Sequence, residues 1–141
     1  MKKFLSGLFV AGFVLVMSVA LSAGTLEDQG KVWLGAKKEP AAVNVAGTWD
    51  SEFGVLRLAQ SEGSREVTGS GGGYELTGVV SGKQLYLLFA THHGNVDYCA
   101  VVTSEDNTSL TGQYHNRVTR LRFGSGLCQE KGRKMYMRKK N

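Results

Sequence analysis

The segment Gly47-Thr48-Trp49 decides the fold of this chain, because the character of the sequence changes there. Before it lie an apolar N-terminal run and a stretch with no sustained period. After it, apolar and polar side chains alternate in short runs, for example at residues 56–58, 118–123 and 134–138. Alternation with a period of two is typical of strands that have one buried and one solvated face.

Turn signals divide this alternating region at intervals of about ten residues. They lie at residues 62–63, 71–73, 81–82, 93–95, 106–107 and 124–126. The single proline, Pro40, precedes every candidate strand. About seven or eight short strands in an open sheet would leave exposed edges, which closure into a barrel removes. We therefore predict an all-β fold, an antiparallel up-and-down meander barrel of about 7–8 short strands.

Two local patterns refine this prediction. Thr-Gly steps recur at Val67-Thr68-Gly69, Leu76-Thr77-Gly78 and Leu110-Thr111-Gly112. Glycine permits a bulge or tight coiling where the sheet bends to close, although ordinary glycine-rich turn usage is the alternative interpretation. The run Leu85–Ala90 is apolar on both faces. We expect a neighbouring element, a loop or a partner subunit of a homo-oligomer to cover it.

The N-terminus resembles a secretory signal peptide. Lys2 and Lys3 precede a largely apolar run from Phe4 to Val19, and small residues follow. This three-part pattern predicts that residues 1–23 are removed on export. A membrane span needs about 20 apolar residues, and polar or glycine residues interrupt this run, so we expect no stable span after cleavage. An uncleaved anchor is the alternative, and the expected location is the periplasm or the medium.

The remaining chain is predicted to form one small domain. Residues 24–44 mix charges with Pro40 and predict a mostly flexible lead-in, with a turn of helix around Val32, that folds back over the barrel. Residues 45–138 are assigned to the barrel and residues 139–141 to a basic tail.

Cys99 and Cys128 are the only cysteines of the chain. Oxidising compartments favour disulfides, so export predicts a bond between them, with two buried free thiols as the alternative. In the chain-entropy model, a loop of this length stabilises the fold by about 3–4 kcal/mol.

Positive charge is concentrated at the C-terminus. Of the 17 Lys and Arg residues, six lie between Lys131 and Lys140, whereas the net charge of the whole chain is +5. Such a segment attracts an anionic membrane or polyanion, or serves as a solvated tail that aids solubility. Bases are not interleaved with several aromatic residues as in single-stranded nucleic-acid binders, so we expect no nucleic-acid partner.

The histidines are weak candidates for a metal site. His92, His93 and His115 lie near predicted strand ends, and two of them with Asp97 have the chemistry to bind zinc or copper. Adjacent histidines on a strand point to opposite faces, so we favour polar loop histidines and expect no cofactor. No motif for nucleophilic or metal-assisted catalysis is present in the sequence, and we do not expect an enzyme.

The same residues resemble the calycin group, and most of all its avidin-type barrels. Gly47-Thr48-Trp49 followed by Gly54 has the spacing of the first avidin hairpin, and Leu76-Thr77-Gly78 and Leu110-Thr111-Gly112-Gln113-Tyr114 are similar to later strand openings. Lipocalins share the Gly-x-Trp start, and Val96-Asp97-Tyr98 resembles their Thr-Asp-Tyr motif. The resemblance covers roughly residues 45–138 and implies a barrel whose mouth holds a small ligand.

This resemblance also implies how the barrel closes. In calycins, a basic residue near the last strand packs on the first tryptophan. Arg138, or alternatively Arg133, is the expected partner of Trp49 in such a cation–π contact.

The biotin site of avidins is not retained. That site needs an asparagine and a serine where this chain has Ser51 and Val55, and no tryptophan follows Trp49. The chain offers Tyr86, Phe89 and Phe123 instead.

The leading hypothesis is therefore a non-enzymatic binding protein of avidin-like or lipocalin-like fold. It would hold a small, partly apolar ligand at the barrel mouth through Trp49, Tyr86, Phe89 and Phe123. The alternative is a filled barrel that recognises another protein, as an enzyme inhibitor or a cell-envelope component. A minor alternative is an accessory metal-binding protein that uses the histidines.

Overall fold

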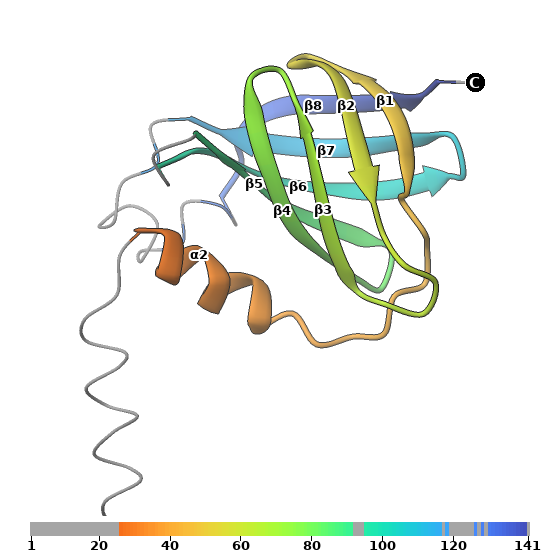
Figure 1. Ribbon diagram of the computed structural model, residues 1–141, viewed down its shortest axis with the longest axis horizontal. Coiled ribbons are helices and arrows are strands. Elements are labelled where there is room, and N and C mark those ends of the chain that lie inside the picture. Colours follow the sequence, from red (N-terminus) through yellow and green to blue (C-terminus); the bar gives the residue numbers. More distant parts are fainter. Residues whose placement is uncertain are drawn as a thin grey trace, which may run out of the picture.

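The computed structural model describes residues 26–91, 95–116, 118, 126, 128 and 130–140. Eight antiparallel strands form a closed barrel in up-and-down order, which confirms the predicted fold class and is consistent with a calycin-like fold (Figure 1). The strands are β1 (Gly47–Ser51), β2 (Gly54–Ala59), β3 (Glu66–Gly71), β4 (Tyr74–Ser81), β5 (Gln84–Ala90), β6 (Val96–Asp106), β7 (Ser109–His115) and β8 (Arg133–Lys139). Each strand pairs with its successor, and β8 pairs with β1 to close the ring.

The interior of the barrel is one hydrophobic core. Alternate residues of every strand point inward, so the strands present a continuous set of apolar side chains to each other. This core consists of Val45, Trp49, Leu56, Leu58, Val67, Leu76, Val80, Leu85, Leu87, Phe89, Ala100, Val102, Leu110, Met135 and Met137. None of these side chains is more than 5% exposed. An eight-stranded barrel is just wide enough for side chains to fill it, and these residues do so.

The Thr-Gly steps mark places where neighbouring strands approach very closely. A Cβ atom built on Gly69, Gly78 or Gly112 would overlap a backbone carbonyl oxygen of the adjacent strand. None of these three glycines is among those with a positive φ, so space and not backbone conformation requires glycine there. The steps therefore permit close strand approach as the barrel coils, which supports the structural interpretation over ordinary turn usage.

A ten-residue helix, α2 (Leu26–Gly35), lies against the outside of the barrel below β4 and β5 (Figure 1). Gly30 allows the approach, because a Cβ at this position would clash with the Leu88 side chain. Leu34 and Leu88 are buried in the same outer cluster. The sequence predicted only one turn of helix in a flexible segment. Helices this short are marginal in isolation, so packing on the barrel stabilises α2.

The helix explains the apolar strand β5. The inward residues of β5 join the barrel core, and the outward Leu88 packs in the cluster that includes Leu34. The outward Tyr86 meets Trp33 of α2 edge to face, with ring centroids 5.5 Å apart. The cover expected over Leu85–Ala90 is thus an element of the same chain, and no partner subunit is needed to bury this strand.

The chain between α2 and β1 folds back along one end of the barrel. The Ala42 amide donates to the Gly82 carbonyl at 2.8 Å, and the Val45 amide donates to the Gln60 side chain at 2.8 Å. At the other terminus, the Lys139 amide donates to the Thr108 carbonyl oxygen in the β6–β7 turn and the Lys140 amide to the Thr48 carbonyl oxygen of β1, both at 2.8 Å. The segment predicted as a basic tail from residue 139 is therefore held against the barrel through Lys140.

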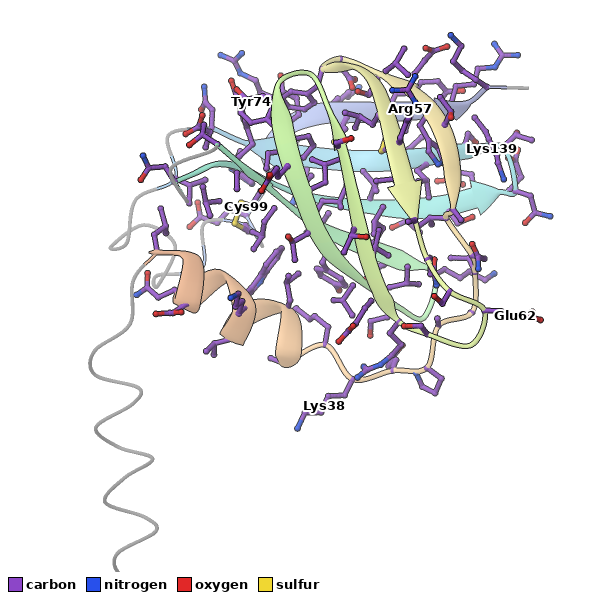
Figure 2. All side chains as sticks on the ribbon, viewed as in Figure 1. Lys38, Arg57, Glu62, Tyr74, Cys99 and Lys139 are labelled. Atoms are coloured by element: carbon purple, nitrogen blue, oxygen red, sulfur yellow. A yellow bond between two sulfur atoms is a disulfide. The ribbon has the colours of Figure 1, made fainter. Side chains whose placement is uncertain are left out.

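The predicted disulfide is confirmed. Cys99 of β6 and Cys128 are bonded across a sequence separation of 29 residues, with Cα atoms 6.0 Å apart (Figure 2). Both cysteines are buried in the outer cluster with Leu34 and Val118. The bond fixes β6 to the segment that precedes β8. The predicted signal peptide lies outside the described residues, and no helix among the described residues is long and apolar enough to cross a membrane.

Candidate functional site

The residues predicted to bind a ligand do not converge on one site. Trp49 and Phe89 lie in the barrel core and are 2% and 0% exposed, whereas Tyr86 lies on the outer face beneath α2. Tyr86 and Phe89 are three positions apart on one strand, so they face opposite sides of the sheet. Phe123 lies outside the described residues.

Trp49 closes the end of the barrel at which β1 begins. Its indole Nε1 donates to the Val45 carbonyl oxygen at 2.9 Å, and the Lys139 ammonium lies 5.9 Å from the ring centroid. The expected cation, Arg138, is exposed and is replaced in this role by the next residue. Met135 and Met137 point inward, so alternation along β8 sends Lys139 toward Trp49 and Arg138 outward. That alternation was the signal in the sequence that identifies Lys139.

Gly47 provides the space for this contact. A Cβ at Gly47 would lie 2.9 Å from Lys139 Cε, and the φ of Gly47 is +141°. A larger residue would displace the lysine and strain the backbone. In the Gly-x-Trp pattern, the glycine thus leaves room for the lysine side chain, and the tryptophan provides the ring that the lysine covers.

Phe53 fills the opposite end of the barrel. It lies in the turn between β1 and β2, and its ring centroid is 4.5 Å from Phe89, 4.9 Å from Tyr98 and 5.0 Å from Tyr114. The Tyr74 ring, at 6.4 Å, completes the cluster. Burial raises the pKa of the Tyr74 hydroxyl, and a hydrogen bond with Tyr98 raises it further. Phe53 is not among the site residues predicted from the sequence, although an aromatic residue in a tight hairpin turn was the available signal.

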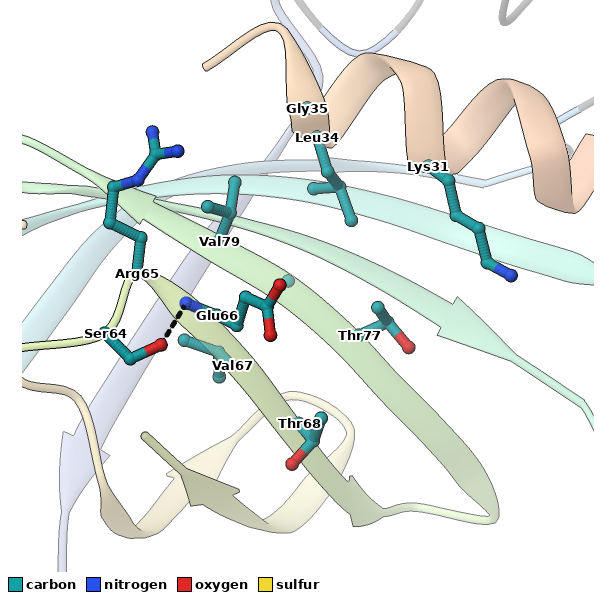
Figure 3. A pocket seen from close by; sticks show the side chains of 11 residues that line it. Lys31, Leu34, Gly35, Ser64, Arg65, Glu66, Val67, Thr68, Thr77 and Val79 are labelled. Atoms are coloured by element: carbon teal, nitrogen blue, oxygen red, sulfur yellow. Dashed lines mark hydrogen bonds between the residues drawn. The ribbon is translucent and has the colours of Figure 1, made fainter. Parts of the chain in front are cut away.

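A groove of about 590 Å³ lies outside the barrel, between α2 and strands β3 and β4 (Figure 3). Leu34 of the helix and Val79 of β4 face each other and form its apolar base. Lys31 and Glu66 contribute a cation and a carboxylate to the rim. The hydroxyl groups of Ser64, Thr68 and Thr77 line the same space. This groove was not predictable from the sequence, because its walls come from separate parts of the chain.

Arg65 links the two walls of the groove through a hydrogen bond. Its Nη1 donates to the Lys37 carbonyl oxygen at 2.6 Å, just beyond the C-terminus of α2. A cation is favourable there because the carbonyl end of a helix carries partial negative charge. Beside it, the Glu66 amide donates to Ser64 Oγ at 3.1 Å. The Arg65 bond connects the β2–β3 loop to the chain just after α2, whereas the Ser64 bond orders the loop where β3 begins.

The histidine candidates gain no support from the described residues. His115 Nε2 lies 2.8 Å from the Glu130 carbonyl oxygen, so a backbone partner occupies this ring nitrogen. The described residues contain no group of three or more His, Cys, Asp and Glu side chains placed to hold a metal ion. His92 and His93 lie outside the described residues.

Comparisons of the chain with protein-family models, curated proteins and solved structures found no match.

Proposed function

We propose that this protein is a non-enzymatic binding protein that recognises a protein partner with the outside of a filled barrel. The packing of the interior carries this proposal. Trp49 and Phe89, which a ligand in the lumen would have to displace, are 2% and 0% exposed. Removing such side chains from a core costs several kcal/mol, so recognition is favoured at the surface.

The groove between α2 and β3–β4 is the proposed recognition site. Its volume of about 590 Å³ is comparable to that of established binding pockets, which are lined by apolar surface and a few placed polar groups. Leu34 and Val79 suit one apolar side chain of a partner. Lys31 and Glu66 line the same groove with charges of opposite sign, which suits polar or charged groups of the partner next to that apolar side chain. This mixture favours a short protein segment over a wholly apolar ligand.

We further infer that the chain is a calycin exported to the periplasm or the medium. The closed eight-stranded barrel that opens with Gly47-Thr48-Trp49, with a cation over the tryptophan, supports the family proposal. The buried Cys99–Cys128 disulfide supports an oxidising compartment.

Site-specific cross-linking tests the groove. A photo-cross-linking amino acid is introduced at Thr77, which lines the groove, or at Glu75, which is exposed on the same strand outside it. In cells that make the protein naturally, we expect a discrete protein adduct from position 77 and none from position 75. The same adducts from both positions, or none from a folded position-77 variant, would contradict the proposal.

A small ligand at the barrel mouth is the second candidate, and the position of Phe53 favours it. Phe53 is only partly buried and comes from a turn, whereas Phe89 beneath it belongs to a strand. An outward movement of this turn would expose a space lined by Phe89, Tyr98 and Tyr114.

Native mass spectrometry of the protein isolated from its own host tests this candidate. We expect a bound small molecule that is lost from Tyr98→Ala and retained by Tyr136→Ala, since Tyr136 is an exposed tyrosine outside the cluster. Wild-type protein without any added mass would exclude it.

A further inference from the structure

The outer face of β8 carries an exposed aromatic ring between cations. Met135 and Met137 are buried in the core, so the residues that alternate with them, Lys134, Tyr136 and Arg138, point outward. Tyr136 is 50% exposed. Side chains on one face of a strand are two residues apart, so both cations lie beside the ring.

Three acidic side chains lie around this face. Asp50 pairs with Lys140 at 4.0 Å. Glu52 Oε1 accepts a hydrogen bond from the Tyr136 amide at 2.8 Å, and Glu105 Oε1 accepts one from the Thr111 hydroxyl at 2.9 Å.

These carboxylates keep their negative charge, and Asp50 lies opposite Arg138 in the β1–β8 ladder, but the exposed cations on this side of the barrel outnumber them, so the face carries a net positive charge. No described acidic residue forms an ion pair with Lys134 or Arg138. Arg133 and Arg57 are also exposed, on β8 itself and on β2. Strand β1 pairs with β8 only at Trp49–Lys139 and Asp50–Arg138, so the Tyr136 amide has no backbone partner on β1. The Glu52 carboxylate accepts its hydrogen bond instead and therefore has a structural role.

This basic face lies on the opposite side of the barrel from the groove. In the ring of eight strands, β8 and β4 are four strands apart in either direction. Figure 1 shows β8 and β1 on the side of the barrel away from α2. A partner on one face would leave the other accessible.

We propose that the outer face of β8 docks on an anionic phospholipid membrane surface. Cations near such a surface are attracted to the lipid phosphates. Tyrosine is favoured at a membrane interface, where its ring meets apolar groups and its hydroxyl remains in water. A soluble polyanion would satisfy the cations but gives no comparable place for the exposed Tyr136 ring. The proposal is independent of the partner that binds in the groove.

Vesicle co-sedimentation of the exported, processed protein tests this inference. We expect binding to phosphatidylcholine vesicles that contain phosphatidylglycerol, weak binding to pure phosphatidylcholine, and loss of binding at high salt because salt screens exposed charges. Lys134→Gln with Arg138→Gln should weaken binding about 25-fold, since each cation contributes about fivefold. Lys38→Gln with Lys83→Gln, which removes the same charge from exposed sites elsewhere, should leave binding within about twofold.

Two further variants complete the test. Tyr136→Ser should weaken binding at every salt concentration, and Thr77→Trp, which fills the groove, should bind vesicles like the wild type. All variants are compared after circular dichroism confirms the native fold. Equal losses from both double variants, equal binding to the two kinds of vesicle, or retention on dextran sulfate without vesicle binding would overturn the proposal.

Discussion

The contact of Lys139 with Trp49 depends on three residues with separate tasks. Gly47 leaves room for the lysine stem, Trp49 provides the ring, and Lys139 brings the charge from the last strand to the first. The contact therefore bridges the seam at which the barrel closes.

Replacement of Lys139 by glutamine should reduce the free energy of unfolding by about 0.5–1 kcal/mol, because the cation–π contact is lost. Arg138→Gln is the matched control, since Arg138 is exposed one position earlier, and should have an effect of less than about 0.5 kcal/mol. Urea unfolding followed by tryptophan fluorescence measures both. Equal destabilisation by the two substitutions would show that Lys139 has no special role.

Asp106 organises the turn between β6 and β7. Its Oδ1 accepts hydrogen bonds from the Thr108 amide and the Thr108 hydroxyl, each at 2.7 Å, and from the Ser109 hydroxyl at 3.3 Å. The side-chain and backbone hydrogen bonds from Thr108 lower the pKa of Asp106 below its ordinary value of 3.8.

This lowered pKa predicts a specific acid sensitivity. The stabilisation is complete above the ordinary pKa, where the carboxylate is ionised in both states, and is lost as pH falls through the lower pKa of the folded protein. The difference in thermal unfolding midpoint between the wild type and Asp106→Asn should therefore shrink as pH is lowered below about 4. A difference that stays constant with pH would contradict the assigned role.

At the scale of elements, strand spacing is set by glycines that lack room for a side chain. Gly112 lies opposite Val102, and a Cβ there would overlap the Val101 carbonyl oxygen. The nearest obstacle is backbone of a paired strand, which cannot move without disturbing the ladder.

Gly112→Ala should therefore destabilise the protein by about 1–3 kcal/mol, the range expected for overpacking. Gly35→Ala is the control, because no atom outside its own stretch of helix lies within 4 Å of a Cβ at Gly35 and its φ is not positive. This control should change stability by less than about 1 kcal/mol. Comparable unfolding midpoints for the two variants in urea would refute the crowding argument.

The helix α2 shows what local sequence does not predict at this scale. Its interior includes Gly30, and glycine is unfavourable in helix interiors. Gly30 is useful only because Leu88 of a distant strand needs the space. A helix that is stabilised by its packing against the barrel therefore cannot be predicted from its own sequence alone.

At the scale of the molecule, the disulfide connects parts that the strand ladder does not pair directly. Cys99 belongs to β6, and Cys128 lies in the connection between β7 and β8. The double variant Cys99→Ala with Cys128→Ala should lose about 3–4 kcal/mol of unfolding free energy in the chain-entropy model. Chemical denaturation of the oxidised wild type and the double variant measures the loss. Coincident unfolding curves would contradict a stabilising role.

The barrel gives this small protein two faces with different chemistry. The groove beside α2 combines apolar and charged groups, whereas the outer face of β8 is basic around Tyr136. Closure of the sheet places these faces on opposite sides. The proposed arrangement is a protein held at a membrane surface by one face, with the other free for a partner.

The sequence by itself determined the all-β barrel, the alternation of strand faces and the Cys99–Cys128 bond, because a period of two and a single pair of cysteines are local or compositional signals. Only the tertiary structure decided the candidate surfaces. Tyr86 lies under a helix, Phe53 fills the mouth, and Leu34 meets Val79 in the groove. These contacts join residues far apart in the chain, and their existence depends on how the closed barrel brings distant segments together.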